Sequence, residues 1–199
     1  AEFPDVYVHT HLSENKDEIA WVKDLFPAQK GYLDVYHHYG LTGQRSVFAH
    51  CVHLEDAEWQ CMHETDSAIA FCPTSNLFLG SGLFPLNKTW QQQVKVGLGT
   101  DVGAGTSFSL LQTVNEAYKV QQLQGDKLSA YESLYHATIG GAKALDLDNK
   151  LGNFNVGKEA DFVVLNLKPT ALQQLRQSRS KSIEDSLFAL FTMGDDRNI

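Results

Sequence analysis

Four short apolar runs alternate with polar or helix-periodic stretches between Asp5 and Val102: DVYVHTHL, SVFAHCVHL, AIAFCPTSN and VKVGLGTDV. The runs are apolar without strict alternation, which is typical of parallel strands covered on both faces. Between the first two runs, Ile19, Val22 and Phe26 recur at helical spacing. The pattern therefore predicts repeated β/α units with four consecutive parallel strands.

The pattern changes after the fourth run. Apolar residues at helical spacing predict one helix over residues 109–123 and a second over residues 130–145. Gly140-Gly141 interrupts the second helix, and we expect another element to pack closely there. A turn-rich stretch then leads into a predicted strand at residues 162–165, and a short amphipathic helix is predicted over residues 183–191. We place a domain boundary near residue 148.

The composition is that of a globular protein and narrows the class of ligand. With 199 residues and 43% hydrophobic content, the chain can bury one substantial core. Its net charge of -8, without a Lys/Arg cluster, gives no basic field for nucleic acid or an anionic membrane. A small-molecule ligand is therefore expected. The three cysteines lack C-x-x-C spacing and no apolar run could span a bilayer, so we expect a cytoplasmic protein.

Three candidate ligands occupy equivalent places in three β/α units. His11, His50 and Asp101 each stand at the C-terminal end of a predicted strand, where side chains from separate units converge in parallel β/α folds. Each alone is more simply a polar strand-end residue, with Asp101 as a helix N-cap. Two imidazoles and one carboxylate together suit zinc or iron. The coincidence of position therefore predicts a site for one divalent metal ion.

Two neighbours of His11 are also candidates. Glu14 follows three residues later, where a carboxylate can move protons beside a metal, and it equally suits the start of a helix. His9 shares a strand face with His11, about 7 Å deeper. From spacing alone it is either a second ligand or a hydrogen-bonded core histidine.

Other reactive residues are assigned structural roles. His53-Leu54-Glu55 is an H-x-E of the kind used by cytidine-type zinc deaminases, but no P-C-x-x-C follows, so this class is excluded. Cys51 is expected to be a small core residue. The histidines in helical or polar stretches are expected at the surface: His37, His38, His63 and His136.

The motifs HLSEN from His11, FAHC from Phe48, FCPTSN from Phe71 and GLGTD from Gly97 together resemble the metal-dependent amidohydrolase superfamily. The resemblance extends from residue 6 to about residue 165. Within the superfamily, HLSEN, GTDVGAGTSFSLLQ, LGNFNVGKEADFVVL and the final GDDRNI look most like the guanine deaminase family.

The resemblance implies which part of the α/β fold is present. The superfamily has an eight-stranded (β/α)8 TIM-type barrel, with an H-x-H clamp on the first strand, single histidines on the fifth and sixth, and an aspartate on the eighth. His11, His50 and Asp101 match the last three, so His9-Thr10-His11 is expected to supply one ligand and not the clamp. Residues 1–147 are then expected to be strands 5–8 of the barrel. Residues 148–199 are expected to be a return segment with part of a small β domain.

The resemblance also implies an activity, the hydrolytic deamination of guanine to xanthine and ammonia. One divalent ion, zinc or iron, is expected on His11, His50 and Asp101. Asp101 would accept a proton from the attacking water, Glu14 would protonate the purine ring, and His50 would also polarise the attacking species. Asn76 is considered as a pocket residue, and substrate contacts are otherwise not assigned.

Two other functions remain open, as do the partners. The substrate is alternatively another aminopurine, a pterin or a triazine. In a different class, the chain is a non-catalytic fragment or an assembly module. Because half a barrel exposes a sheet edge and apolar faces, we expect this chain to be poorly soluble alone. Because the H-x-H clamp is missing, we also expect it to be inactive alone. We expect it to pair with the missing N-terminal half or to form a homodimer.

Overall fold

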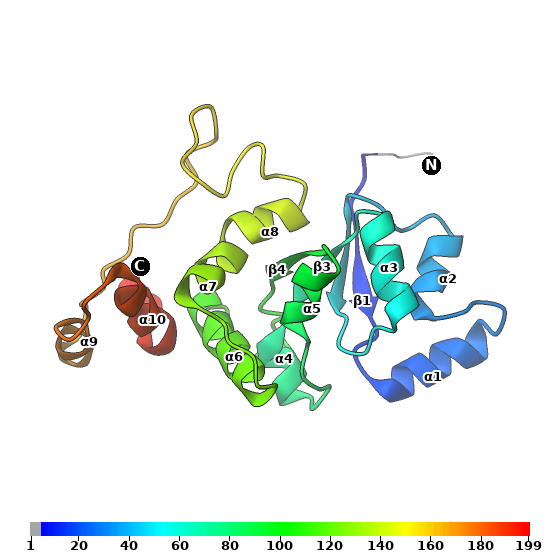
Figure 1. Cartoon of the computed structure of the whole chain (residues 1–199), viewed down its shortest axis with the longest axis horizontal. Coiled ribbons are helices and arrows are strands. Elements are labelled where there is room, and N and C mark those ends of the chain that lie inside the picture. The colour runs from blue at the N-terminus through cyan, green and yellow to red at the C-terminus, as the bar shows by residue number, and fades with distance from the viewer. Residues whose placement is uncertain (1–4) are drawn as a thin grey trace.

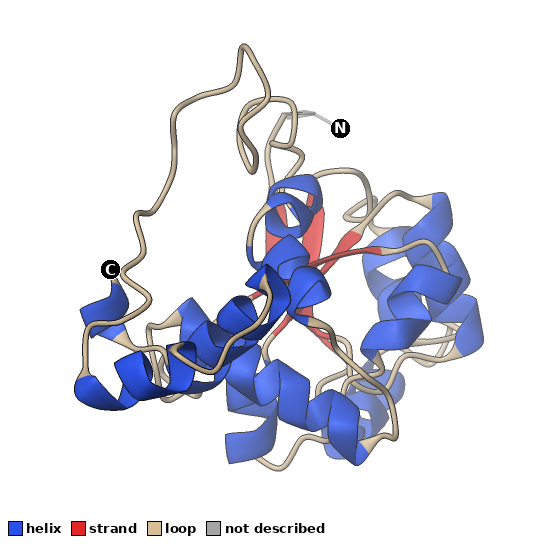
Figure 2. Cartoon of the chain, turned by 60° about the vertical axis from the view of Figure 1, so that its left-hand side comes forward, coloured by secondary structure: helices blue, strands red, loops and turns tan. Residues whose placement is uncertain are grey.

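A parallel sheet lies at the centre of the molecule, which was obtained as a computed structural model that describes residues 5–199. Figure 2 shows its strands in red with helices around them. Four strands pair in chain order: β1 (Val8–Leu12), β2 (Ser46–His50), β3 (Ala68–Phe71) and β4 (Lys95–Leu98). The predicted succession of four parallel strands is confirmed.

Short helices follow each of the first three strands. They are α1 (Lys16–Leu25), α2 (Tyr32–His38), α3 (Asp56–Glu64), α4 (Pro73–Phe78) and α5 (Leu86–Gln91). Asn15 caps α1, because its Oδ1 accepts a hydrogen bond from the Glu18 backbone at 2.8 Å. Helix α3 begins with a capping box between Glu55 and Glu58. The first three helices lie at one end of the molecule (Figure 1).

The two faces of the sheet differ in side-chain size. One face carries large apolar side chains, including Leu12, Phe48 and Phe71, which are fully buried in a core with Trp59 of α3 and Phe84. The other face carries a row that crosses the sheet in register: His11, Ala49, Ala70 and Gly97. Small side chains along this row leave room above the sheet.

The predicted helix over residues 130–145 is instead two helices, α7 (Ala130–Ala137) and α8 (Ile139–Ala144), which follow α6 (Leu110–Leu123). Thr138 separates them with φ −132° and ψ −100°, so the chain turns and α8 packs on β4. The expected close approach is present, since a Cβ added to Gly97 would lie 2.8 Å from the Cα of Gly141. The contact with the sheet explains why the helix does not continue straight.

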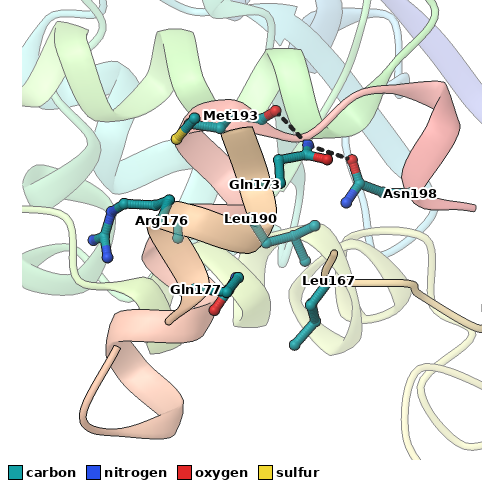
Figure 3. A pocket seen from close by; sticks show the side chains of 8 residues that line it. Leu167, Gln173, Arg176, Gln177, Leu190, Met193 and Asn198 are labelled. Carbon is teal, nitrogen blue, oxygen red and sulfur yellow. Dashed lines mark hydrogen bonds between the residues drawn. The ribbon is translucent and has the colours of Figure 1, made fainter. Parts of the chain in front are cut away.

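The C-terminal residues form α9 (Ala171–Gln177), α10 (Ile183–Met193) and a 3-10 turn (Asp196–Asn198). These elements are joined by the side chain of Gln173 (Figure 3). Its Nε2 donates to the Met193 carbonyl at 2.8 Å and to Asn198 Oδ1 at 3.0 Å. The predicted helix at residues 183–191 is confirmed and runs two residues further.

The predicted strand at residues 162–165 is wrong. This part of the described chain belongs to a long loop between α8 and α9, which extends away from the sheet (Figure 1). Phe162, Val163 and Val164 are 60%, 63% and 75% exposed. An apolar run becomes a strand only when a second strand satisfies its backbone groups, and residues 148–199 contain no strand to do so. Among residues 5–199, no helix is long and apolar enough to cross a membrane.

Candidate metal centre

His11, His50 and Asp101 meet at the C-terminal ends of the strands. One nitrogen or oxygen atom from each lies within 4.8 Å of the others. The imidazoles of His11 and His50 stack, with ring centroids 5.1 Å apart and an interplanar angle of 14°. Residues separated by up to 90 positions therefore share one small volume.

The donor set fits a divalent transition metal. Two imidazoles and one carboxylate are ligands of borderline softness that suit zinc and iron. Ligand atoms at about 2.1 Å from one ion are at most about 4.2 Å apart, and His50 Nε2 is 3.9 Å from Asp101 Oδ2. An ion held by all three residues would draw any wider pair slightly closer. The Nε2 of His50 is also buried without a hydrogen-bond partner, which is expected of an atom that binds a ligand.

The backbone of His50 directs its ring toward His11. His50 pairs with Leu12 in the sheet register, so an unbroken pleat would place it on the core face. His50 and Cys51 instead adopt the left-handed region, with φ of 72° and 52°. Burial lowers the pKa of His50, while the nearby carboxylates of Glu14 and Asp101 oppose this shift. A neutral imidazole is the form that binds a metal or donates one hydrogen bond.

Asn76 holds the other nitrogen of the same ring. The side-chain nitrogen of Asn76 lies 2.9 Å from His50 Nδ1, and both residues are 1% exposed. If the amide nitrogen donates, the imidazole proton is on Nε2, and if the amide oxygen accepts, Nε2 is free to bind a cation. From the sequence, Asn76 is expected only as a pocket residue. Nothing in the motif FCPTSN predicts that its asparagine contacts a histidine 26 positions earlier in the chain.

Glu14 faces the cluster from the turn between β1 and α1. Its Oε2 is 3.6 Å from His50 Nε2, and its Oε1 accepts a hydrogen bond from the Ser81 hydroxyl at 2.9 Å. Glu14 precedes Asn15, the N-cap of α1, and so lies outside the helix. A carboxyl group in this position can exchange a proton with a molecule bound beside His50.

Asp101 is not a helix N-cap. It lies in the loop after β4 with φ 48°, and the next helix, α6, is capped by Ser109. Its side chain lines a hollow of about 390 Å³ over the small-residue face of the sheet, within the range of small-molecule sites, roughly 300–1,000 Å³. His9, His11, Cys72 and Thr100 also line this hollow.

The remaining histidines correct or complete the sequence predictions. His9 is exposed and lines the hollow, because this face of β1 is open. In the part of the chain that the structure describes, His9 is therefore not a core histidine. His136 is 2% exposed and lies against Trp90 and Tyr135, so the prediction that it is a surface residue is wrong. A helical pattern does not reveal which polar side chain faces a neighbouring element. His37, His38 and His63 are exposed and Cys51 is buried, as expected.

Comparison with known proteins places this geometry in a family. Residues 1–199 match the Amidohydrolase family. The guanine deaminase of Escherichia coli (strain K12) is 67% identical over 198 residues, covering 100% of this chain and 45% of its own length. A solved E. coli guanine deaminase superposes with a TM-score of 0.98, covering 100% of this chain and 46% of that one.

Two further structures extend the comparison. A guanine deaminase from C. acetobutylicum, described with guanine bound in its active site, is 34% identical with a TM-score of 0.86, covering 98% and 46% of the two chains. An adenosine deaminase from Xanthomonas campestris, described with bound zinc, is 28% identical with a TM-score of 0.82, covering 92% and 41%. The chain thus spans about half the length of the curated relatives that it matches. On its sequence match and its architecture, this chain belongs to the Amidohydrolase family.

Proposed function

We propose that the protein containing this chain hydrolyses guanine to xanthine and ammonia, and that this chain supplies strands 5–8 of its (β/α)8 barrel. The observation that carries the proposal is the cluster of His11, His50 and Asp101 within 4.8 Å of one another, with Glu14 3.6 Å from His50. Identity of 67% to the E. coli guanine deaminase supports guanine as the substrate.

His11, His50 and Asp101 would hold one divalent cation, and a relative described with bound zinc favours zinc over iron. When bound, such a cation supplies a water molecule that ionises near neutral pH. The residues of this chain orient that water and move its protons. For His50 Nε2 to be free for the cation, Nδ1 must carry the proton and donate it to the amide oxygen of Asn76. This requires the opposite amide orientation to the one that places the Asn76 side-chain nitrogen 2.9 Å from Nδ1.

The proton transfers follow from the positions of the two carboxyl groups. Asp101 accepts one proton from the attacking water and returns it to the departing amino group as the C–N bond breaks. Glu14 gives a proton to the ring nitrogen beside the amino-bearing carbon as the C–O bond forms there. Glu14 regains a proton from the new hydroxyl group when the carbonyl forms. Both hydrogens of water are thus accounted for, one in ammonia and one on the ring.

The remainder of the active site would come from outside this chain. We propose that an N-terminal half supplies strands 1–4, the H-x-H clamp and most contacts to the purine. Residues 1–147 would complete the barrel, and residues 148–199 would join a small β domain. The exposed edge of β1 and the exposed run Phe162–Leu165 support pairing with such a half, and a homodimer is the other assembly proposed.

The test uses the full-length protein, with metal content and xanthine formation measured together. We expect one tightly bound metal ion per chain and xanthine from guanine. Glu14→Gln should retain the metal and lower turnover on the order of 10²-fold, whereas Asp101→Ala should lose metal. Glu184→Gln, a change of an exposed side chain on α10, is the matched control.

Three results would contradict parts of this proposal. An unchanged rate in Glu14→Gln would remove Glu14 from the mechanism. Full metal occupancy in Asp101→Ala would remove Asp101 from the ligands. Deamination of another aminopurine, a pterin or a triazine, with guanine untouched, would keep the mechanism and change the substrate.

A further inference from the structure

The loop after α4 reaches the candidate acid of the active site. Ser81, in the loop between α4 and α5, is 8% exposed. Its hydroxyl group donates a hydrogen bond of 2.9 Å to Oε1 of Glu14, which is 67 positions earlier in the sequence. The function proposed above assigns no role to this serine.

Three contacts fix the position of Ser81. Its backbone nitrogen donates to the Asn76 carbonyl at 2.9 Å, and its own carbonyl oxygen is 2.8 Å from His53 Nε2. The next residue, Gly82, has φ 132°, and a Cβ there would lie 2.9 Å from a Val52 methyl carbon. A side chain at this position would therefore force the loop away from Val52, in the segment that follows β2. The backbone of Ser81 thus has little freedom to follow Glu14 if that side chain moves.

The hydrogen bond distinguishes the two oxygens of Glu14. A hydroxyl group has one hydrogen to donate, and Ser81 directs it to Oε1. Oε2 is left facing the site, 3.6 Å from His50 Nε2. Because Oε1 accepts the Ser81 hydrogen, protonation of the carboxyl group is favoured on Oε2, where a bound molecule can receive the proton.

We propose that Ser81 is a positioning residue, which holds Glu14 so that Oε2 is the oxygen that delivers and regains the proton. This inference rests on the proposed deamination. In each cycle Oε2 gives its proton to the ring nitrogen and takes one from the new hydroxyl group, while the Ser81 hydrogen stays on its own oxygen. His53 acts one step further away, by fixing the Ser81 backbone.

The kinetic test uses the full-length, metal-loaded protein with guanine. Ser81→Ala should lower kcat on the order of 10-fold or more, because a misplaced proton donor slows the chemical step, with little change in KM. Ser81→Thr keeps the hydroxyl group and should restore most of the rate. In a Glu14→Gln background, Ser81→Ala should cause no further loss, because no proton carrier remains to be positioned.

Ser67→Ala is the matched control. Ser67 is 1% exposed and bonds to the Gly43 backbone at 3.0 Å, at the opposite ends of the strands from the site. It should lower the melting temperature and leave kcat unchanged. An unchanged kcat in Ser81→Ala would overturn the proposal. It would also be overturned if Ser81→Ala lowered kcat by the same factor in the Glu14→Gln background as in the unmodified protein.

A second readout does not depend on the substrate. In a crystal structure of Ser81→Ala, the Glu14 carboxyl group should be rotated or should occupy more than one position. The metal content should stay that of the unmodified protein. A Glu14 side chain that keeps its place would overturn the proposal even if guanine is the substrate. If the unmodified protein does not deaminate guanine, the proposed function fails, and the position of Glu14 still decides the role of Ser81.

Discussion

Nδ1 of His50 lies 2.9 Å from the side-chain nitrogen of Asn76, and both side chains are buried. The contact joins the end of β2 to α4. It holds the ring plane of His50, and the amide atom that faces Nδ1 sets which ring nitrogen carries the proton.

Removal of this partner should impair the site without unfolding the protein. We expect Asn76→Ala in the full-length protein to lower turnover by about 10–100-fold, because the His50 ring is then free to rotate. Asn115→Ala is a matched control, since its amide donates to the carbonyl of Thr192 in α10 at 2.9 Å and makes no hydrogen bond with His50 or Asn76. A normal rate in Asn76→Ala would show that the contact has no role in orientation.

Asn76→Asp tests the state of His50 directly. A carboxylate at this position only accepts, so Nδ1 would carry the hydrogen and Nε2 would be free to bind the cation. We therefore expect Asn76→Asp to retain metal, measured by elemental analysis of the dialysed protein. Loss of metal in this variant would contradict the ligand role of His50.

The contact between β4 and α8 should tolerate no side chain. Gly97→Ala places a Cβ 2.8 Å from the Gly141 Cα, and the backbone must shift to relieve the clash. We expect a loss of about 1–3 kcal/mol in the free energy of unfolding, measured by urea denaturation. Gly103→Ala is the control, because a Cβ there meets no atom within 4 Å and its stability should stay near that of the unmodified protein.

Glu58 should contribute more to stability than a typical capping residue. Its two oxygens accept hydrogen bonds of 2.9 Å from the backbones of Leu33 and Glu55, and the residue is 7% exposed. Glu58→Ala should cost roughly 1–3 kcal/mol in the free energy of unfolding, because buried donors lose their acceptor. The equivalent change in the exposed capping box of α7, Glu132→Ala, should cost less, and equal losses would show that burial is irrelevant here.

His136 should make stability sensitive to acid. Burial lowers its pKa below the ordinary 6.5, although a hydrogen bond to the Val96 carbonyl opposes the shift. The folded state therefore binds a proton more weakly than the unfolded state. The stabilisation is complete above the unfolded pKa of about 6.5, and it is lost as the pH falls through the folded pKa.

Thermal unfolding between pH 7.5 and 5.5 measures this effect. We expect His136→Gln to lose less stability over that interval than the unmodified protein. His63→Gln changes an exposed histidine and should leave the pH dependence as it was. An identical dependence in His136→Gln would remove this residue from the acid response.

Much of the fold follows from local pattern. Apolar runs mark β1 to β4, and the helical spacing of residues 183–191 marks α10. Where a prediction failed, the cause was a contact with a distant segment. Thr138 breaks a helix because α8 packs on β4, and residues 162–165 form no strand because no second strand lies beside them in residues 148–199.

The sequence by itself determined which residues meet at the candidate metal centre. His11 and His50 lie at the C-terminal ends of β1 and β2, and Asp101 follows β4. Parallel strands end at one edge of the sheet, so these side chains converge there. Only the tertiary structure revealed how these side chains are held. The bonds from Asn76 to His50 and from Ser81 to Glu14 span 26 and 67 positions. No periodicity connects residues so far apart, because their distance depends on how loops fold over the sheet.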